Sequence, residues 1–456
     1  MAHNTSYGAG LTVEVDPISR IEGHLGVKLT TDATGKVTEA DVHGNLWRGF
    51  ENFLIGRNPN DAITFVQRIC GVCPVPHGTT SAFAIDAVYG YNDNFQTFMA
   101  GGNYTPSGSN ADVVALPAGM GVPAKAIHIR NLVLAAEFLM SHITHSYHLA
   151  APSYVQGPPI PPWTPYFADS YYHPLLRSAG KTLPVQSAGF SSDLWSAVIT
   201  QYVKALRIRR LTFEAGALFA GRMPMTSALV AGGVLNDKSE SLGTKCTKFR
   251  NLMTEVGDFI VKEFIPTFLA LGALYPNYDN LGNANTLYGL DAPHTLWELA
   301  NVANVGVAPG AGNTAYGAGV GNFLSWGAFP QTNGQLGIKR GYKIGASPIV
   351  AGITSAQVLA NLREHIAHSR YTGSWTLDAN DNPVFAAATI TDPATEARTE
   401  PERTMAAKYS WLKAPRWTVG ATNYAMEVGP FARMVVGGNY PVDGTTLLSN
   451  GVGGLY

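Results

Sequence analysis

The chain has 456 residues, a formal net charge of −1 and only 14% charged residues. Because no stripe of lysine and arginine is present, a protein that binds nucleic acid through its phosphates is disfavoured. Three cysteines are too few for a disulfide framework, and the scarcity of charge indicates that partner subunits cover part of the surface.

The first residues and the hydropathy pattern bear on location. Met1–Gly10 contains no basic segment followed by an apolar run, so no signal peptide is expected in this chain. No uninterrupted apolar stretch reaches about 18 residues, so no membrane-spanning helix is expected. Export together with a partner that carries the signal remains open.

Three short antiparallel strands are predicted at Leu11–Val15, Gly26–Thr31 and Lys36–Val42, where apolar and polar residues alternate. An Arg-x-Glu-Gly-His cluster lies between the first two strands. Burying these charges is costly unless they pair or serve a function. From the residues alone, a surface ion pair of Arg20 and Glu22 is the simpler interpretation.

The next segment is predicted to be helical. Apolar residues recur at helical spacing over Leu46–Gly56, with Glu51 beside them as an ordinary solvated carboxylate. Asp61 is expected to cap a second helix that runs through Phe65, and Ser81–Tyr89 predicts a third. The chain between these two helices holds two of the three cysteines.

This cysteine stretch runs from Arg68 to His77, with Cys70 and Cys73 three residues apart. The C-x-x-C spacing suits two thiolates on one metal, or a dithiol that closes into a disulfide. Arg68 favours negatively charged sulfurs, and His77 can donate a hydrogen bond to one of them. Half of a zinc site, a redox pair and two core cysteines are alternatives. Any metal here needs further ligands from elsewhere.

Three long helical patterns follow, at Ala124–Leu149, Ser192–Ala220 and Ser239–Leu274, the last with a kink expected at Pro266. Cys246 has no metal-ligating neighbours and is interpreted as an inert thiol. Three histidines recur at every third position of the first helix, and packing is a more common role for such a set than metal binding. They are His142, His145 and His148.

Long helices with small peripheral strands predict a mainly α fold with small antiparallel β-sheets, an α+β arrangement. Glycine-rich and proline-rich stretches are expected to be loop insertions near 92–123, 151–190 and 300–345. We interpret residues 1–456 as one domain.

Six short motifs, in this order along the chain, resemble the large subunit of a nickel–iron hydrogenase. They span nearly the whole sequence, and a chance occurrence of all six in the family's order is very improbable. The motifs are E-V-D-P-I-S-R-I-E-G-H at 14–24, W-R-G-F-E at 47–51, R-I-C-G-V-C-P-V-P-H at 68–77, N-F-L-S-W-G-A-F at 322–329, Y-S-W-L-K-A-P-R at 409–416 and M-E-V-G-P-F-A-R at 426–433.

The resemblance implies a helical subunit that holds a buried nickel–iron centre, whose iron carries diatomic ligands. Cys70 would be a terminal thiolate on nickel, and Cys73 would bridge nickel and iron. His77 would hydrogen-bond the bridging sulfur, and Arg68 would support the same loop.

Two carboxylates also acquire roles by resemblance. Glu22 would be the proton gate, since heterolytic cleavage of dihydrogen releases a proton that needs a relay out of a dry site. Glu51 would help to hold a magnesium or iron ion near the centre. The electrons would pass to a small subunit with iron–sulfur clusters, and membrane association through partners is expected, on the periplasmic face or alternatively in the cytoplasm.

The sequence departs from the family in lacking the C-terminal D-P-C-x-x-C-x-x-H motif, which brings the second thiolate pair. Arg416 matches an earlier loop and not the one that carries the family's catalytic arginine, and Ser141 replaces a common aspartate. We therefore expect a split large subunit, in which a second chain supplies the missing cysteine or selenocysteine pair. A truncated inactive fragment, a scaffold like the quinone-binding subunit of complex I and a zinc-binding module are the alternatives.

Overall fold

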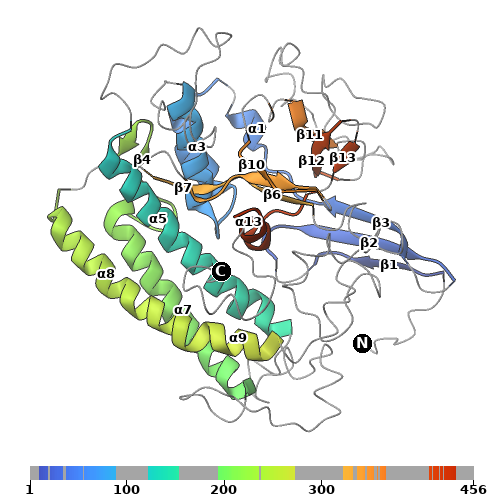
Figure 1. Cartoon of the computed structure of the whole chain (residues 1–456), viewed down its shortest axis with the longest axis horizontal. Coiled ribbons are helices and arrows are strands. Elements are labelled where there is room, and N and C mark those ends of the chain that lie inside the picture. The colour runs from blue at the N-terminus through green and yellow to red at the C-terminus, as the bar shows by residue number, and fades with distance from the viewer. Residues whose placement is uncertain are drawn as a thin grey trace. The chain divides into compact units, whose positions relative to one another are not determined.

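The computed structural model describes residues 10–18, 21–33, 37–54, 56–88, 122–153, 194–235, 238–272, 322–331, 336–344, 347–353, 357, 360–365, 410–412, 414–420, 422–424 and 426–437. The chain divides into two compact units, which are described one at a time. Unit 1 comprises residues 1–57 and 356–423, and unit 2 comprises residues 58–355 and 424–456. The predicted combination of long helices and small antiparallel sheets is confirmed (Figure 1), whereas the single-domain organisation remains a prediction.

Unit 1 begins with the three predicted strands, β1 (Thr12–Val15), β2 (Leu25–Thr31) and β3 (Val37–Gly44), which pair antiparallel in that order. The predicted helix over 46–56 is too long, because α1 covers only Phe50–Phe53. Gly49 and Gly56 flank it with φ angles of 72° and 74°, a conformation that ends helices.

A second small sheet completes unit 1 and pairs β11 (Leu362–His365), β12 (Ala414–Val419) and β13 (Thr422–Tyr424) in that order. Trp417 on β12 is fully buried. Large aromatic side chains bury much apolar area, so this residue anchors the sheet.

Unit 2 opens with α2 (Pro59–Phe65), the short 3-10 helix η1 (Val66–Arg68) and α3 (Pro74–Val88). The predicted cap at Asp61 is wrong. Asn58 caps α2, and its side-chain oxygen accepts a hydrogen bond from the Asn60 amide at 3.0 Å. Pro59 is pre-organised for the first helical position, so the helix begins before Asp61.

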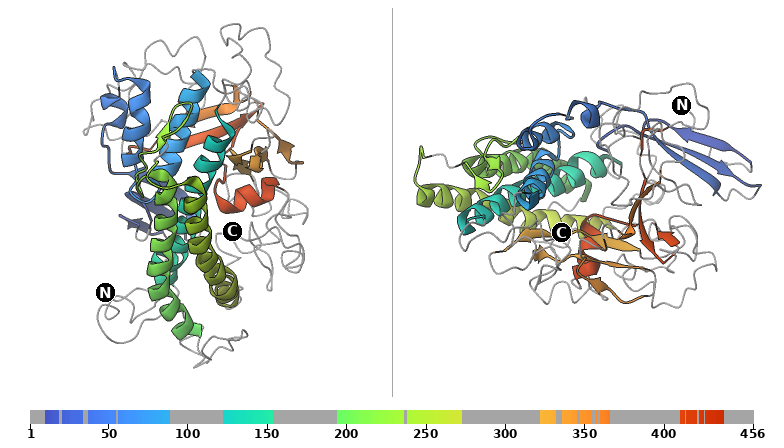
Figure 2. Two further views of the ribbon diagram at one scale, coloured as in Figure 1. Left: turned by 90° about the vertical axis from the view of Figure 1, so that its left-hand side faces the viewer. Right: turned by 90° about the horizontal axis from the view of Figure 1, so that it is seen from above.

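The core of unit 2 is built on long helices that lie side by side in Figures 1 and 2. Their shared cluster of buried residues joins the predicted apolar faces and contains Ile143, Tyr147, Ala205, Ile208, Leu211, Val256 and Phe259. The elements are α5 (Ala124–Ile143), continued by η2 (Thr144–Ala150) and η3 (Ala151–Ser153); α7 (Leu194–Ala220); and α8 (Leu242–Phe259), continued by η4 (Ile260–Phe264) and α9 (Ile265–Gly272).

The helical run with a kink expected at Pro266 contains a π-helical turn, η4, which ends at Phe264, two residues before the proline. Proline has no N–H to donate to the carbonyl four residues earlier, and a wider turn accommodates that loss. In the part of the chain that the structure describes, no helix is long and apolar enough to span a bilayer.

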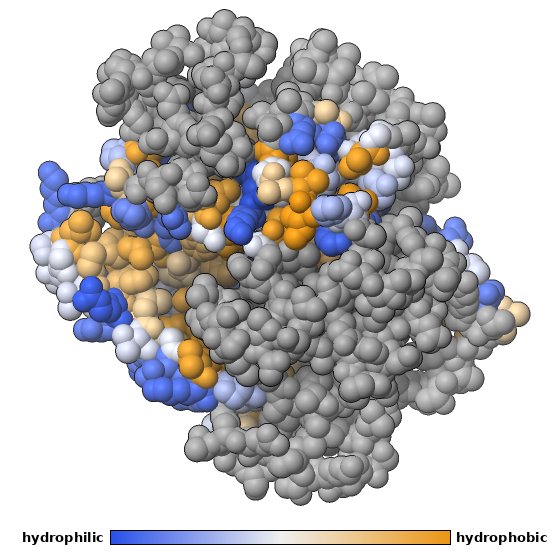
Figure 3. All heavy atoms as spheres, in the orientation of Figure 1, coloured by the Kyte–Doolittle hydropathy of each residue, from blue (hydrophilic) through white to orange (hydrophobic). Residues whose placement is uncertain are grey.

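Two apolar residues of α7 face solvent. Val203 and Leu206 are 56% and 51% exposed, although their apolar character predicts an inward position. Gln201 and Ala205 lie in the buried stripe of α7, together with larger apolar residues such as Ile208. Lys204 of α7 forms an ion pair with Glu263 of η4. Figure 3 shows hydrophilic and apolar side chains next to one another over the long helices.

Short strands complete unit 2. Residues 322–344, within the third expected insertion, carry four of these strands, and the described residues of the first two insertions are only 122–123 and 151–153. The strands pair as β4–β5, β7–β8 and β10–β9–β6. The remaining elements are β4 (Leu229–Val230), β5 (Gly233–Val234), β6 (Phe323–Ser325), β7 (Ala328–Pro330), β8 (Leu336–Ile338), β9 (Gly341–Lys343), β10 (Val350–Ala351) and α13 (Pro430–Gly437).

Candidate metal centre

The two neighbouring cysteines form a tight turn between η1 and α3. The Cys70 Sγ accepts hydrogen bonds from the backbone amides of Val72 and Cys73, at 3.3 and 3.1 Å. Cys70 is buried, Cys73 is partly exposed, and both are free thiols. Amide donors directed at a sulfur support the negative charge that a metal-bound thiolate carries. The turn therefore presents two soft donors in surroundings suited to a thiophilic metal.

His77 and Arg68 flank this turn. His77 lies near the start of α3, where burial lowers the pKa of its imidazole. It is therefore mainly neutral near pH 7 and can donate one hydrogen bond. Arg68 ends η1, and its guanidinium donates to the Thr64 carbonyl oxygen one turn earlier.

One buried carboxyl close to the cysteine turn was not predicted from the sequence as a functional residue. Glu137 of α5 is 1% exposed, and its Oε2 accepts a hydrogen bond from the Val75 amide at 2.9 Å. Burial raises the pKa of Glu137 to about 8. The sequence did contain a signal for this residue. Glu137 lies at helical spacing from Val133 and Met140, and a carboxylate within such an apolar stripe is costly to bury without a purpose.

This carboxyl predicts a pH-dependent stability. In the unfolded chain Glu137 ionises near its ordinary value of 4.5, and in the folded chain near 8. Its contribution is therefore complete below pH 4.5 and is lost as the pH rises through 8. At about 1.4 kcal/mol per pKa unit, the loss is on the order of several kcal/mol. Glu137→Gln, which cannot ionise, should flatten this dependence in urea unfolding of the nickel-free full chain between pH 5 and 9.

A matched control is Glu214→Gln, which changes an exposed carboxylate of α7. This variant should keep the pH dependence of the unmodified chain because solvent screens an exposed group. Identical curves for Glu137→Gln and the unmodified chain would show that Glu137 does not titrate between these values.

The two carboxylates expected at the centre belong to unit 1, whereas the cysteines belong to unit 2. Glu22 lies on an exposed bend shortly before β2. Glu51 lies in α1, and its side chain is outside the described residues. The structure thus describes the backbone position of each of these two glutamates.

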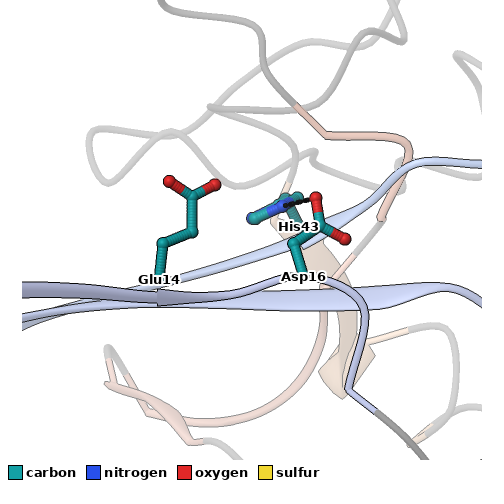
Figure 4. Close-up of side chains that lie close together, drawn as sticks. All are labelled: Glu14, Asp16 and His43. Atoms are coloured by element: carbon teal, nitrogen blue, oxygen red, sulfur yellow. Dashed lines mark hydrogen bonds and ion pairs between the residues drawn. The ribbon is translucent and has the colours of Figure 1, made fainter. Parts of the chain in front are cut away.

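Glu14, Asp16 and His43 bring their ligand atoms within 4.8 Å of one another on the first sheet (Figure 4). Hydrogen bonds from His43, at 3.2 Å, and from Asn45, at 2.9 and 2.8 Å, engage the Asp16 carboxylate and lower its pKa. Protein donors thus already satisfy this exposed group, which ties the end of β1 to β3. Among the described residues, the cysteine turn gathers no comparable set of three ligands.

Two of the three histidines of α5 and η2, His142 and His148, are partly buried and contact backbone carbonyl oxygens. The ring Nδ1 of His142 lies 2.8 Å from the Phe138 carbonyl oxygen, and Nε2 of His148 lies 3.2 Å from that of Tyr202. His145 is exposed. No metal cluster of these histidines occurs within the described ranges.

Motifs far apart in the sequence meet within each unit. In unit 1, Trp47 stacks on Trp411 with ring centroids 5.4 Å apart, and the Gly44 amide donates to Ser410 Oγ at 3.0 Å. In unit 2, Phe323 bridges to Glu427. Four of the six motifs are thus joined in pairs, so they form parts of common structures.

Comparison with known proteins decides the family. The sequence pattern of the nickel-dependent hydrogenases matches residues 48–97, 187–295 and 299–446, which is more than half of the chain. The chain belongs to this family. A second family pattern, described as HoxL-like, matches residues 12–43 of the same chain.

Relatives of this hydrogenase family member include the periplasmic [NiFeSe] hydrogenase large subunit of Desulfomicrobium baculatum, 34% identical over 59% of this chain and 45% of that protein. The hydrogenase-1 large chain of Escherichia coli K12 is 25% identical, over 95% of this chain and 68% of the relative. The solved Ni-Fe-Se hydrogenase of D. vulgaris Hildenborough superposes with a TM-score of 0.65 at 28% identity, over 96% of this chain and 70% of that one. The chain thus spans between about half and two thirds of these relatives' length.

Proposed function

We propose that this chain is the catalytic large subunit of a nickel–iron hydrogenase, an oxidoreductase that cleaves dihydrogen heterolytically and reversibly. The observation that carries the proposal is the turn of two free thiols, with two backbone amides directed at Cys70 Sγ, in a member of the nickel-dependent hydrogenase family. A nickel–iron centre would supply the redox chemistry and Lewis acidity for this cleavage.

The donors of the turn fit such a centre, since soft thiolates suit both metals. The thiolates of Cys70 and Cys73 would both hold the nickel–iron centre. Cys246 lies exposed on α8 and has no part in this set. Two further donors, cysteine or selenocysteine, would come from outside these 456 residues.

The residues beside the thiolates would position them. His77, half-buried near the start of α3, would donate its ring N–H to the sulfur of Cys73. Arg68 at the end of η1 would hold the turn and offset its negative charge. Both are placed by the helical elements that border the turn, so neither depends on a long loop.

Glu22 would carry the released proton away. The exposed position of its bend suits a relay between a closed site and solvent. Glu22→Gln should leave the nickel and iron content unchanged. It should slow the isotope exchange between dihydrogen and deuterated solvent on the order of a hundredfold or more, because an amide cannot pass on a proton. Glu14→Gln, at another exposed carboxylate of unit 1, should exchange normally. Full exchange by Glu22→Gln would remove Glu22 from the mechanism.

The resemblance supports further assignments. Glu51 would offer a hard oxygen to a magnesium or iron ion. A small subunit with iron–sulfur clusters would take the electrons, as in the heteromeric assemblies to which large subunits belong. The relatives include a periplasmic enzyme, and we accordingly place the assembly at the periplasmic face of a membrane, held through partners, with the cytoplasm as the alternative.

Elemental analysis of the native assembly tests the proposal. Nickel and iron in comparable amounts support a hydrogenase, zinc alone indicates a structural module, and absence of metal indicates a scaffold. Mass spectrometry of the same assembly should identify a polypeptide that carries a second C-x-x-C or selenocysteine pair. An assembly without nickel, or without a further pair of sulfur or selenium donors, contradicts the proposal.

A further inference from the structure

The start of α3 has an unusual supply of hydrogen-bond donors. The helix begins at Pro74, directly after Cys73, and the next residues are Val75 and Pro76. Prolines have no N–H, so Val75 provides the only backbone donor among residues 74–76. Val75 is completely buried, and a buried donor without an acceptor is costly. The geometry of this helix start, and of the turn before it, therefore depends on what accepts this one hydrogen bond.

The acceptor comes from a different helix. Glu137 of α5 places its Oε2 2.9 Å from the Val75 nitrogen, although 62 residues separate the two in sequence. Because Glu137 is only 1% exposed, water does not compete for this hydrogen bond. A protonated carboxyl keeps a carbonyl oxygen as acceptor, and so does a glutamine amide.

A second buried side chain, Gln67, packs against α3. The Nε2 of Gln67 donates to the carbonyl oxygens of Ile63 and Thr226, at 2.9 and 3.1 Å. Its side chain packs against Gly78, where an added Cβ would lie 3.0 Å away. Gln67 thus contacts α3 by packing at Gly78, whereas Glu137 accepts a hydrogen bond from the Val75 amide. The Cys70–Cys73 turn is attached to the end that Glu137 holds.

We propose that Glu137 is a positioning residue for the cysteine turn, because its side-chain oxygen holds the one backbone donor available at the start of α3. The inference deepens the proposed function, since it assigns a residue of α5 to the metal-binding turn. Without the acceptor, the first turn of α3 opens, the two amides directed at Cys70 Sγ lose their alignment, and the buried thiol becomes accessible.

The test compares three variants of the nickel-free full chain. Glu137→Gln keeps an acceptor, and Glu137→Met has similar length but offers none. Val256→Ala destabilises a buried cluster that contains no residue of α3, so it controls for general loosening. The readout is the rate of alkylation at Cys70, by mass spectrometry, divided by the rate at Cys246, an exposed internal reference.

Glu137→Met leaves the buried Val75 amide without an acceptor, so it should raise this ratio about tenfold or more. It should also accelerate deuterium uptake by the peptide that spans residues 71–82. Glu137→Gln and Val256→Ala should leave the ratio within about twofold of the unmodified chain, because the first keeps an acceptor for the Val75 amide and the second changes a cluster that contains no residue of α3. In the native assembly, Glu137→Met should lower the nickel content.

Three results overturn the inference: an unchanged ratio in Glu137→Met, an equal rise in Glu137→Gln, or an equal rise in Val256→Ala. The first excludes a positioning role, the second shows that the accepting atom is irrelevant, and the third reports general loosening. The alkylation readout uses no metal, so it stands even if the native assembly contains no nickel and the proposed hydrogenase function fails.

Discussion

Replacing Cys70 by serine should remove nickel from the native assembly and abolish hydrogen-dependent dye reduction. Serine has nearly the same size and can still accept hydrogen bonds from the amides of Val72 and Cys73, so the turn should fold. Its hydroxyl is a hard and weakly acidic donor, however, and does not replace a thiolate on a soft metal. Elemental analysis and a dye-reduction assay on the same preparation measure both effects.

The matched control is Cys246→Ser, which changes the exposed thiol of α8. This variant should retain nickel and activity. Normal nickel content in the Cys70→Ser variant would show that the metal binds without this sulfur, and the assignment of the turn would then be wrong. Loss of nickel in both variants would point to damage during purification instead, because the control thiol is not part of the turn.

Replacing Asp86 by alanine should destabilise unit 2 by about 3–5 kcal/mol, the range measured when one partner of a buried ion pair is removed. Asp86 on α3 and Arg130 on α5 are 0% and 3% exposed, and their side-chain atoms lie 2.6 Å apart. Arg130 also donates to the carbonyl oxygens of Val230 and Gly233. Without Asp86, its charge remains buried among acceptors that do not neutralise it.

Urea unfolding of the full chain measures this loss as a lower midpoint with an unchanged slope. Glu214→Ala is the control, since it breaks the exposed Arg210–Glu214 pair, which should contribute less than about 1 kcal/mol. Combining Asp86→Leu with Arg130→Met removes both charges and should recover much of the stability. A loss as small as that of the control would show that Arg130 finds full compensation elsewhere.

Local sequence patterns were enough to predict most of the helices, the first three strands and the Cys70–Cys73 turn. Alternation over β1–β3 and helical periodicity over α5, α7 and α8 depend on neighbours within a few residues, and these predictions are confirmed. The C-x-x-C spacing is also local, so the turn of Cys70 and Cys73 was visible from the sequence. Conformation that neighbouring residues dictate can be inferred without knowledge of the fold.

Tertiary structure decided which side chains face one another. The exposed positions of Val203 and Leu206 depend on where α5 and α8 pack against α7, and no periodicity within α7 reveals that. The acceptor for Val75 is likewise a residue 62 positions away, and Asp86 and Arg130 neutralise each other across 44 positions. A carboxyl or guanidinium reveals its purpose only when its partner is known, because burial without a partner would be too costly for either group.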